Sequence, residues 1–215
     1  MSKIKFIVTV MLVFSTLLLQ AQRQKGSSVT GTYKTDIINM ISQKSASVTS
    51  MQCSFKQEKF VSVLAESSVS EGVMYYQSPD RLHWEYNTPK HSAFILNGDV
   101  MCYESDNSKR KLDAARNKSM SEMVKLIASS LNGSGFSDSE NFKVDVFKNE
   151  SSYCVVLSPL KKNMKNFMSE MAVFLNQNYL AESIEMTDAN GDITIITISS
   201  CKVNTDIPSE VFSIE

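Results

Sequence analysis

Apolar and polar residues alternate with a period of two through most of this chain, and that alternation limits the folds it can adopt. In the first such segment Cys53 and Phe55 alternate with Ser54 and Lys56. A period of two places successive side chains on opposite faces of a strand, so the segment is expected to have one buried face and one face toward water. Residues typical of turns separate it from later segments: Ser78-Pro79-Asp80, Thr88-Pro89-Lys90 and Asn97-Gly98-Asp99.

The segments with this character recur along the whole chain. Asp188-Ala189-Asn190-Gly191 is a hairpin turn between the last two of them, and residues 207–214 have the composition of one more edge strand. About ten or eleven short strands with two helices between them predict a mainly β fold with α-helices, built as an unclosed antiparallel half-barrel. The predicted strands are 53–57, 69–77, 81–86, 92–96, 100–104, 142–147, 153–157, 168–175, 180–187 and 193–203.

Two segments change to the helical period. In residues 36–48 the apolar residues fall mostly on one helical face, and Thr35 or Asp36 is the candidate N-cap. In residues 120–131 an apolar stripe follows a capping-box sequence, Ser119 with Glu122, and Asn132-Gly133 ends it. This second helix interrupts an otherwise β chain and is a candidate lid over the sheet.

The N-terminus has the order of a secretory signal peptide. Lys3 and Lys5 precede an apolar run over 6–19, and Ala21 offers a small residue for cleavage before Gln22. The run is shorter than the roughly 20 apolar residues that span a bilayer as a helix. We predict a cleaved signal peptide over 1–21, a flexible leader over 22–34 and a single domain over 35–215. An uncleaved membrane anchor is the alternative.

The composition gives little support to catalysis or to nucleic-acid binding. The formal net charge is −1, so no basic field for nucleic acid is indicated. The two histidines, His83 and His91, lack metal-ligand spacing, and no C-x-x-C pair or G-x-S-x-G elbow occurs. His83 alternates with apolar neighbours, which predicts a position facing water. We therefore predict no enzymatic activity, no metal and no cofactor.

The four cysteines leave two alternatives open. Residues 53, 102, 154 and 201 are far apart in the chain, and export permits disulfides. Three complete pairings are possible, and the sequence does not rank them. Each cysteine also lies in an apolar or alternating segment, where it can pack as a buried thiol.

The choice of apolar residues suggests an adaptable surface. Ten of the twelve methionines lie after residue 22, among many phenylalanines and tyrosines. Methionine is unbranched and polarizable, which suits surfaces that accept apolar ligands of several shapes. The same residues would also fill an ordinary core. A wide β-barrel, however, can enclose a ligand cavity under a covering helix.

Several short motifs occur in a distinctive order along the chain. They are Ser54-Phe55-Lys56-Gln57, Leu82-His83-Trp84-Glu85-Tyr86, Pro89, Asn97-Gly98-Asp99, Leu157-Ser158-Pro159 and the turn at 188–191. An N-terminal helix precedes them, and a glycine, Gly72, opens the strand before the second motif. In this order the motifs resemble the LolA family of periplasmic lipoprotein carriers, and the likeness extends over nearly all of the chain after the signal peptide.

The resemblance implies an unclosed barrel whose helices cover a hydrophobic cavity, in the periplasm of a Gram-negative bacterium. It implies an acylated lipoprotein as cargo, an inner-membrane transporter as donor, an outer-membrane acceptor, and a protein that acts as a monomer. Carriers of a glycolipid or polyene-type lipid, and a non-carrier interaction domain, are the alternatives. The predicted cavity residues are Met51, Phe55, Leu82, Trp84, Val124 and Ile127 by resemblance, Phe94, Leu96 and Tyr103 by strand parity, and Met123 from the helical stripe.

One departure from the family pattern concerns lid closure. Family members often carry a basic residue immediately before the proline that ends the second strand, and here that position is Ser78. Arg81 follows three residues later and is the candidate substitute. The alternative is that this protein opens and closes through other contacts. The basic clusters 109–111 and 161–162 are either solvated loops or docking sites for an acidic partner.

Overall fold

The computed structural model describes residues 23–214, except 65, 107, 113–117 and 132. The predicted signal peptide therefore lies outside the described residues. Among the side chains, those of 112, 118–123, 125 and 134 are also outside the description. In the part of the chain that the structure describes, no helix has the length and apolar character needed to cross a membrane.

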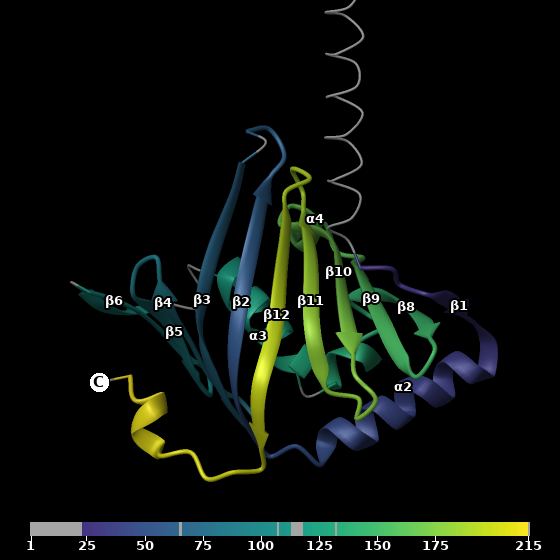
Figure 1. Ribbon diagram of the computed structural model, residues 1–215, viewed down its shortest axis with the longest axis horizontal. Helices are drawn as coiled ribbons and strands as arrows, with labels where there is room; N and C mark the ends of the chain where they lie inside the picture. The colour runs from purple at the N-terminus through teal and green to yellow at the C-terminus, as the bar shows by residue number, and fades with distance from the viewer. Residues whose placement is uncertain (1–22, 65, 107, 113–117, 132, 215) are drawn as a thin grey trace, which may run out of the picture.

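Twelve strands form one sheet in which every neighbouring pair is antiparallel, and the sheet does not close (Figure 1). Its order is β1-β8-β9-β10-β11-β12-β2-β3-β4-β5-β6-β7. The predicted half-barrel is therefore confirmed, with twelve strands. The strands are β1 Ser27–Val29, β2 Ser50–Val61, β3 Glu66–Gln77, β4 Arg81–Thr88, β5 Ser92–Asn97, β6 Val100–Ser105, β7 Ser108–Leu112, β8 Phe142–Asn149, β9 Ser152–Pro159, β10 Met168–Leu175, β11 Ala181–Asp188 and β12 Ile193–Val203.

The segment expected to be a flexible leader, 22–34, is ordered from β1 onward. Val29 of β1 pairs with Val146 of β8 and is buried. Helix α2 then begins at Gly31, after Thr30, and not near Asp36. The sequence does not indicate this first helical turn. Its residues are mostly exposed, for example Tyr33, which is 50% exposed, so they do not follow the apolar period of a helix.

The helices lie on one side of the sheet, which we call its inner face. Ile37 and Ile41 of α2 (Gly31–Ala46) and Leu131 of α3 (Lys118–Leu131) join the same buried cluster as the side chains of β2–β6. Figure 1 shows α3 behind the central strands and α2 along the lower edge. The predicted second helix is confirmed and ends at Leu131; its capping-box side chains lie outside the described residues.

Gly133, just after α3, allows a close approach between elements. It has φ +67°, and an added Cβ would lie 2.6 Å from Oγ of Ser45 in α2. The short 3₁₀ helix η1 (Ser134–Ser137) follows it. Glycine here lets the end of α3 pack directly against α2.

The C-terminal tail was expected as an edge strand, and this is wrong. Ser209–Phe212 form the 3₁₀ helix η2, which contacts β4 and β5 on the opposite, outer face of the sheet. The Phe212 side chain is fully buried. Pro208 cannot donate a ladder hydrogen bond, and the apolar tail instead covers outward-facing apolar residues such as Ile95, which is buried.

The tail also corrects the prediction for His83, whose side chain is only 16% exposed and does not simply face water. Its Nδ1 donates to the Val211 carbonyl at 2.5 Å. The Asn97 side-chain amide donates to the Phe212 carbonyl at 3.1 Å. Both contacts hold η2 against the outer face.

One disulfide forms, and two buried thiols remain. Cys53 of β2 bonds to Cys201 of β12, 148 residues apart in sequence, while Cys102 and Cys154 are free and buried. Each of the two alternatives therefore holds for one pair of cysteines. β12 and β2 are neighbours at the centre of the strand order, so the disulfide joins the two halves of the sheet.

Candidate functional site

Strand pairing places predicted and unpredicted apolar residues of β2–β6 together in two neighbouring rows across the inner face. The members of each row are directly opposite one another in consecutive strands, so their side chains share a face. The first row is Met51, Tyr76, Leu82, Leu96 and Met101, and the second row is Cys53, Met74, Trp84, Phe94 and Tyr103.

The two rows differ in their exposure to solvent. Every member of the first row is at most 2% exposed. In the second row Trp84 is buried, but Phe94 and Tyr103 are half-exposed, and their ring centroids are 5.0 Å apart. The first row is therefore covered across β2–β6, and only the second row becomes more accessible toward β5 and β6.

Phe55, the third inward residue of β2 after Met51 and Cys53, forms an aromatic group with Trp84 and Tyr86. Phe55 lies 4.3 Å from Trp84, with the two ring planes tilted by 32°, and meets Tyr86 edge-on at 5.3 Å. These apolar rings fill the space above Gly72, which pairs with Phe55 and Tyr86.

The aromatic group contains one buried polar atom without an ordinary hydrogen bond. The Tyr86 hydroxyl donates to Gln57 Oε1 at 2.9 Å. Burial raises the pKa of Tyr86, while Trp84 and Gln57 act in the opposite direction. Trp84 Nε1 is buried and makes no hydrogen bond of ordinary geometry with a described residue. Its N–H can therefore donate to a carbonyl oxygen that enters the inner face.

Helix α3, the predicted lid, packs on the buried cluster of the inner face. Val124 and Ile127 are partly buried and contact the cluster, and Leu126 and Ala128 are buried in it. The structure thus brings two of the three predicted helix residues to the inner face. The third, Met123, has a side chain outside the described residues.

Ser78 and Arg81, the candidate transfer residues, lie at the β3–β4 turn. Ser78 is exposed, and its backbone N–H donates to the Thr49 carbonyl at 2.9 Å. Arg81 donates to Gln77 Oε1 at 3.3 Å. Because Arg81 precedes the inward Leu82 in β4, it belongs to the outer face, and the observed partner is a side chain of the same hairpin and not a lid helix.

Sequence reasoning missed several members of the rows. Met74, Tyr76 and Met101 were not among the predicted cavity residues, although each has the strand parity of a predicted neighbour. The inner contribution of Ile37 and Ile41 from α2 was also missed as part of the site. Strand parity and pairing carry the signal for the first three, whereas the burial of Ile37 and Ile41 in the same cluster is a tertiary contact that no local pattern indicates.

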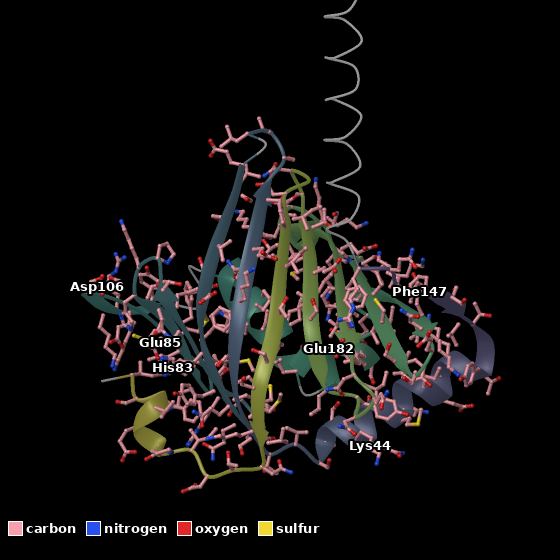
Figure 2. All side chains as sticks on the ribbon, in the orientation of Figure 1. Lys44, His83, Glu85, Asp106, Phe147 and Glu182 are labelled. Carbon is pink, nitrogen blue, oxygen red and sulfur yellow. A yellow bond between two sulfur atoms is a disulfide. The ribbon has the colours of Figure 1, made fainter. Side chains whose placement is uncertain are left out.

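The two histidines lie away from the inner face. Glu85, on the outer face of β4, is 3.7 Å from His83 Nε2 and 3.2 Å from His91 Nε2. Figure 2 shows His83 and Glu85 on the same side of the molecule as Asp106, whose carboxylate is 3.6 Å from His91 Nδ1. Among the described residues no group of three His, Cys, Asp or Glu side chains is arranged to hold a metal ion.

A comparison with known protein families identifies the family to which this chain belongs. The family described as "Outer membrane lipoprotein carrier protein LolA" matches residues 46–215. The chain belongs to the LolA family. The predicted resemblance is therefore confirmed, and the members of this family are carriers of outer-membrane lipoproteins, not enzymes.

Individual relatives of this LolA-family chain are distant. An outer-membrane lipoprotein carrier protein from Chromohalobacter salexigens is 28% identical over 173 residues, which are 79% of this chain and 78% of the relative. A putative outer-membrane lipoprotein-sorting protein domain from Vibrio parahaemolyticus is 13% identical, with TM-score 0.48, over 83% of this chain and 95% of the other. The lipoprotein LppX of Mycobacterium tuberculosis is 13% identical, with TM-score 0.44, over 80% and 96%.

Proposed function

We propose that this protein is a periplasmic carrier that shields the acyl chains of lipoproteins and moves them from the inner to the outer membrane. Membership of the LolA family supports a carrier role for lipids or lipoproteins. The observation that carries the proposal is the pair of apolar rows across β2–β6, which belong to one buried cluster with residues of α2 and α3.

The physical need for such a carrier follows from the cargo. Burial of each methylene is worth about 0.8 kcal/mol, so acyl chains released into water must be covered during transit. In the present structure the side chains of the rows and of α3 cover one another. An acyl chain therefore enters by displacing α3, and it replaces the contacts that α3 makes with the sheet.

The composition of the rows suits repeated loading and release. Met51, Met74 and Met101 supply flexible side chains to the inner face, and unbranched side chains can repack around chains of different shape. An adaptable face of this kind favours moderate affinity over tight binding, which a carrier needs in order to release its cargo. An inner-membrane transporter as donor and an outer-membrane acceptor complete the proposed route, and a monomer suffices for it.

Mass spectrometry of the amphiphiles bound to the exported protein tests this proposal. The informative variant is Phe94→Asp, because Phe94 is a half-exposed member of the second row and its substitution places a charge on the inner face without removing a fully buried side chain. Tyr75→Asp is the matched control, since Tyr75 is an aromatic residue on the outer face of β3, beside His83. Circular dichroism confirms that both variants fold.

We expect acylated lipoprotein on the wild type and on Tyr75→Asp, and at least about tenfold less on Phe94→Asp, because burying an unpaired charge against acyl chains is unfavourable. Recovery of a glycolipid or polyene-type lipid in place of lipoprotein would support a carrier role with a different cargo. Absence of any amphiphile from folded wild-type protein would reject the carrier and favour an interaction domain.

A further inference from the structure

Three loops meet at one end of the sheet, and we call them together the loop end: residues 62–64, 160–167 and 189–192. Ser62 donates from its backbone N–H and its hydroxyl to Asp192 Oδ1, at 2.9 and 3.1 Å. Ala189 N–H donates to the Phe167 carbonyl at 3.3 Å. Figure 1 shows the β2–β3 turn, the β11–β12 turn and α4 (Lys162–Lys165) together at the upper end of the molecule.

Apolar side chains are unusually exposed at the loop end. Of the seven large apolar residues exposed among the described residues, four are here: Val63 at 85%, Leu64 at 62%, Leu160 at 49% and Phe167 at 40%. Single exposed apolar residues are ordinary, whereas a group of them on neighbouring loops marks a surface for binding. Val63 and Leu64 occupy the tip of a hairpin, where nothing in the fold requires an apolar side chain.

Positive charge accompanies these residues. The ten residues from Leu160 to Ser169 include Lys161, Lys162 and Lys165 and no acidic residue. All three lysines are exposed, while Met164 between them is buried and anchors α4 to the core. An open pocket of about 440 Å³ lies beside them, lined by Lys143, Ser158, Pro159, Leu160, Lys165, Met168 and Ser169.

The acidic side chains of the adjoining turn are occupied within the protein. Asp188 Oδ1 accepts from the N–H groups of Asn190 and Asp192, at 2.7 and 3.0 Å. Asp192 accepts from Ser62 as described above. Glu66, exposed at the start of β3, is the acidic residue that follows the Val63–Leu64 tip. Lys161, which immediately precedes α4, and Lys162 and Lys165 within it face solvent beside the exposed apolar residues; these three are called the lysines of α4.

We propose that the loop end docks on the surface of a bilayer that contains anionic phospholipids. Val63, Leu64 and Phe167 enter the boundary between headgroups and acyl chains, and the lysines of α4 bind lipid phosphates. Exposed apolar residues flanked by lysines are the combination that holds proteins at such an interface. An acidic protein surface would match the lysines but would leave the two apolar residues at the hairpin tip without a partner. This inference does not depend on the cargo, because the loop end and the inner face share none of the residues argued for either.

Flotation with lipid vesicles tests the proposal. The sample is the exported chain with its N-terminus determined by mass spectrometry, so that the apolar run over 6–19 is known to be absent. The vesicles contain either phosphatidylcholine alone or equal parts of phosphatidylcholine and phosphatidylglycerol. One variant removes the apolar tip, Val63→Ser with Leu64→Ser, and the other reverses charge, Lys161→Glu with Lys162→Glu.

The matched controls are Val100→Ser and Lys44→Glu. Val100 is an exposed apolar residue of β6, and Lys44 is an exposed lysine in the last turn of α2, which Figure 2 places at the end of the molecule opposite the loop end.

We expect salt-sensitive binding to the anionic vesicles, unchanged in the controls and weakened about tenfold or more in each loop-end variant. Each lysine near such a surface contributes roughly a factor of five, and each buried methylene of Val63 and Leu64 contributes roughly a factor of four. Failure of the wild type to bind, or equal binding by wild type and loop-end variants, would overturn the proposal. Either result would leave the carrier proposal standing, because cargo on the inner face is measured without added vesicles.

Discussion

Phe55 and Trp84 pack together on the inner face with their ring centroids 4.3 Å apart and their planes tilted by 32°, and the glycine in the strand between them is what permits this contact. A Cβ added to Gly72 would lie 1.8 Å from the Glu85 carbonyl oxygen and 2.8 Å from Cζ of Phe55. A side chain at residue 72 therefore conflicts with both the backbone of β4 and the aromatic group.

Gly72→Ala is expected to destabilise the fold by about 1–3 kcal/mol, the usual range for overpacking a core. The neighbouring strand cannot yield cheaply, because the close atom is a backbone carbonyl in the β3–β4 ladder. Chemical denaturation measures the change in the free energy of unfolding. Ser68→Ala, at an exposed position of the same strand, should stay within about 0.5 kcal/mol of wild type. Equal stability of Gly72→Ala and wild type would show that the β3–β4 packing is different.

The disulfide between Cys53 and Cys201 closes a loop of 148 residues across the centre of the sheet. We expect the double variant Cys53→Ala with Cys201→Ala to lose about 2–5 kcal/mol of unfolding free energy, because the unfolded chain gains conformational freedom. A reductant should lower the melting temperature of wild type and leave that of the double variant unchanged. If reductant has no effect on wild type, the bond is absent or does not constrain the unfolded state.

Cys154 is expected to be inert toward alkylation in the folded protein. Burial raises the pKa of its thiol to about 12, so almost no thiolate is present at pH 8. Cys102 is buried as well. Iodoacetamide should label neither thiol in native protein, two after unfolding without reductant, and four after reduction. Rapid labelling of native protein would mean that the core around β6 and β9 opens readily.

Glu185 on β11 should give the protein a stability that depends on pH. Burial raises the pKa of this carboxyl, which accepts from the Arg23 N–H at 3.1 Å. The folded state therefore holds the proton more tightly than the unfolded state, and stability falls as pH rises from the unfolded pKa through the folded one.

The variant Glu185→Gln keeps an acceptor for Arg23 and removes the charge. It should gain stability relative to wild type at pH 7 and lose that advantage near pH 4. Denaturation curves at the two pH values measure it, with the exposed Glu140→Gln as control. An advantage that does not change with pH would show that Glu185 is solvated in the folded state.

The sequence predicts faces well because alternation is a local property. Leu82 and Trp84 are inward and Glu85 outward, as the period of two requires. Pairing between distant segments is not local, so nothing in the alternation indicates that β12 lies beside β2 or that β1 covers the edge of β8. β7 was not predicted because Lys109, Arg110 and Lys111 interrupt any alternation, and only its pairing with β6 makes it a strand.

The same distinction between local alternation and non-local pairing applies to the candidate site. Parity identified Phe94, Leu96 and Tyr103 without knowledge of their partners, and the register then aligned them with Leu82 and Trp84. The tail over the outer face escaped prediction for a different reason. Its apolar residues Ile207 and Phe212 are buried, and η2, which contains Phe212, contacts β4 and β5 far away in sequence. A short apolar segment alone does not reveal which face it will cover.

The central claim, that acyl chains lie against the inner face of β2–β6, is tested most directly by site-specific photocrosslinking in the living cell. A benzoylphenylalanine at position 94 reports on the inner face, and the same residue at position 75 reports on the outer face of the same half of the sheet. We predict crosslinks to acylated lipoproteins from position 94 and none from position 75. Equal crosslinking from both positions, or lipoprotein crosslinks from position 75 alone, would contradict it.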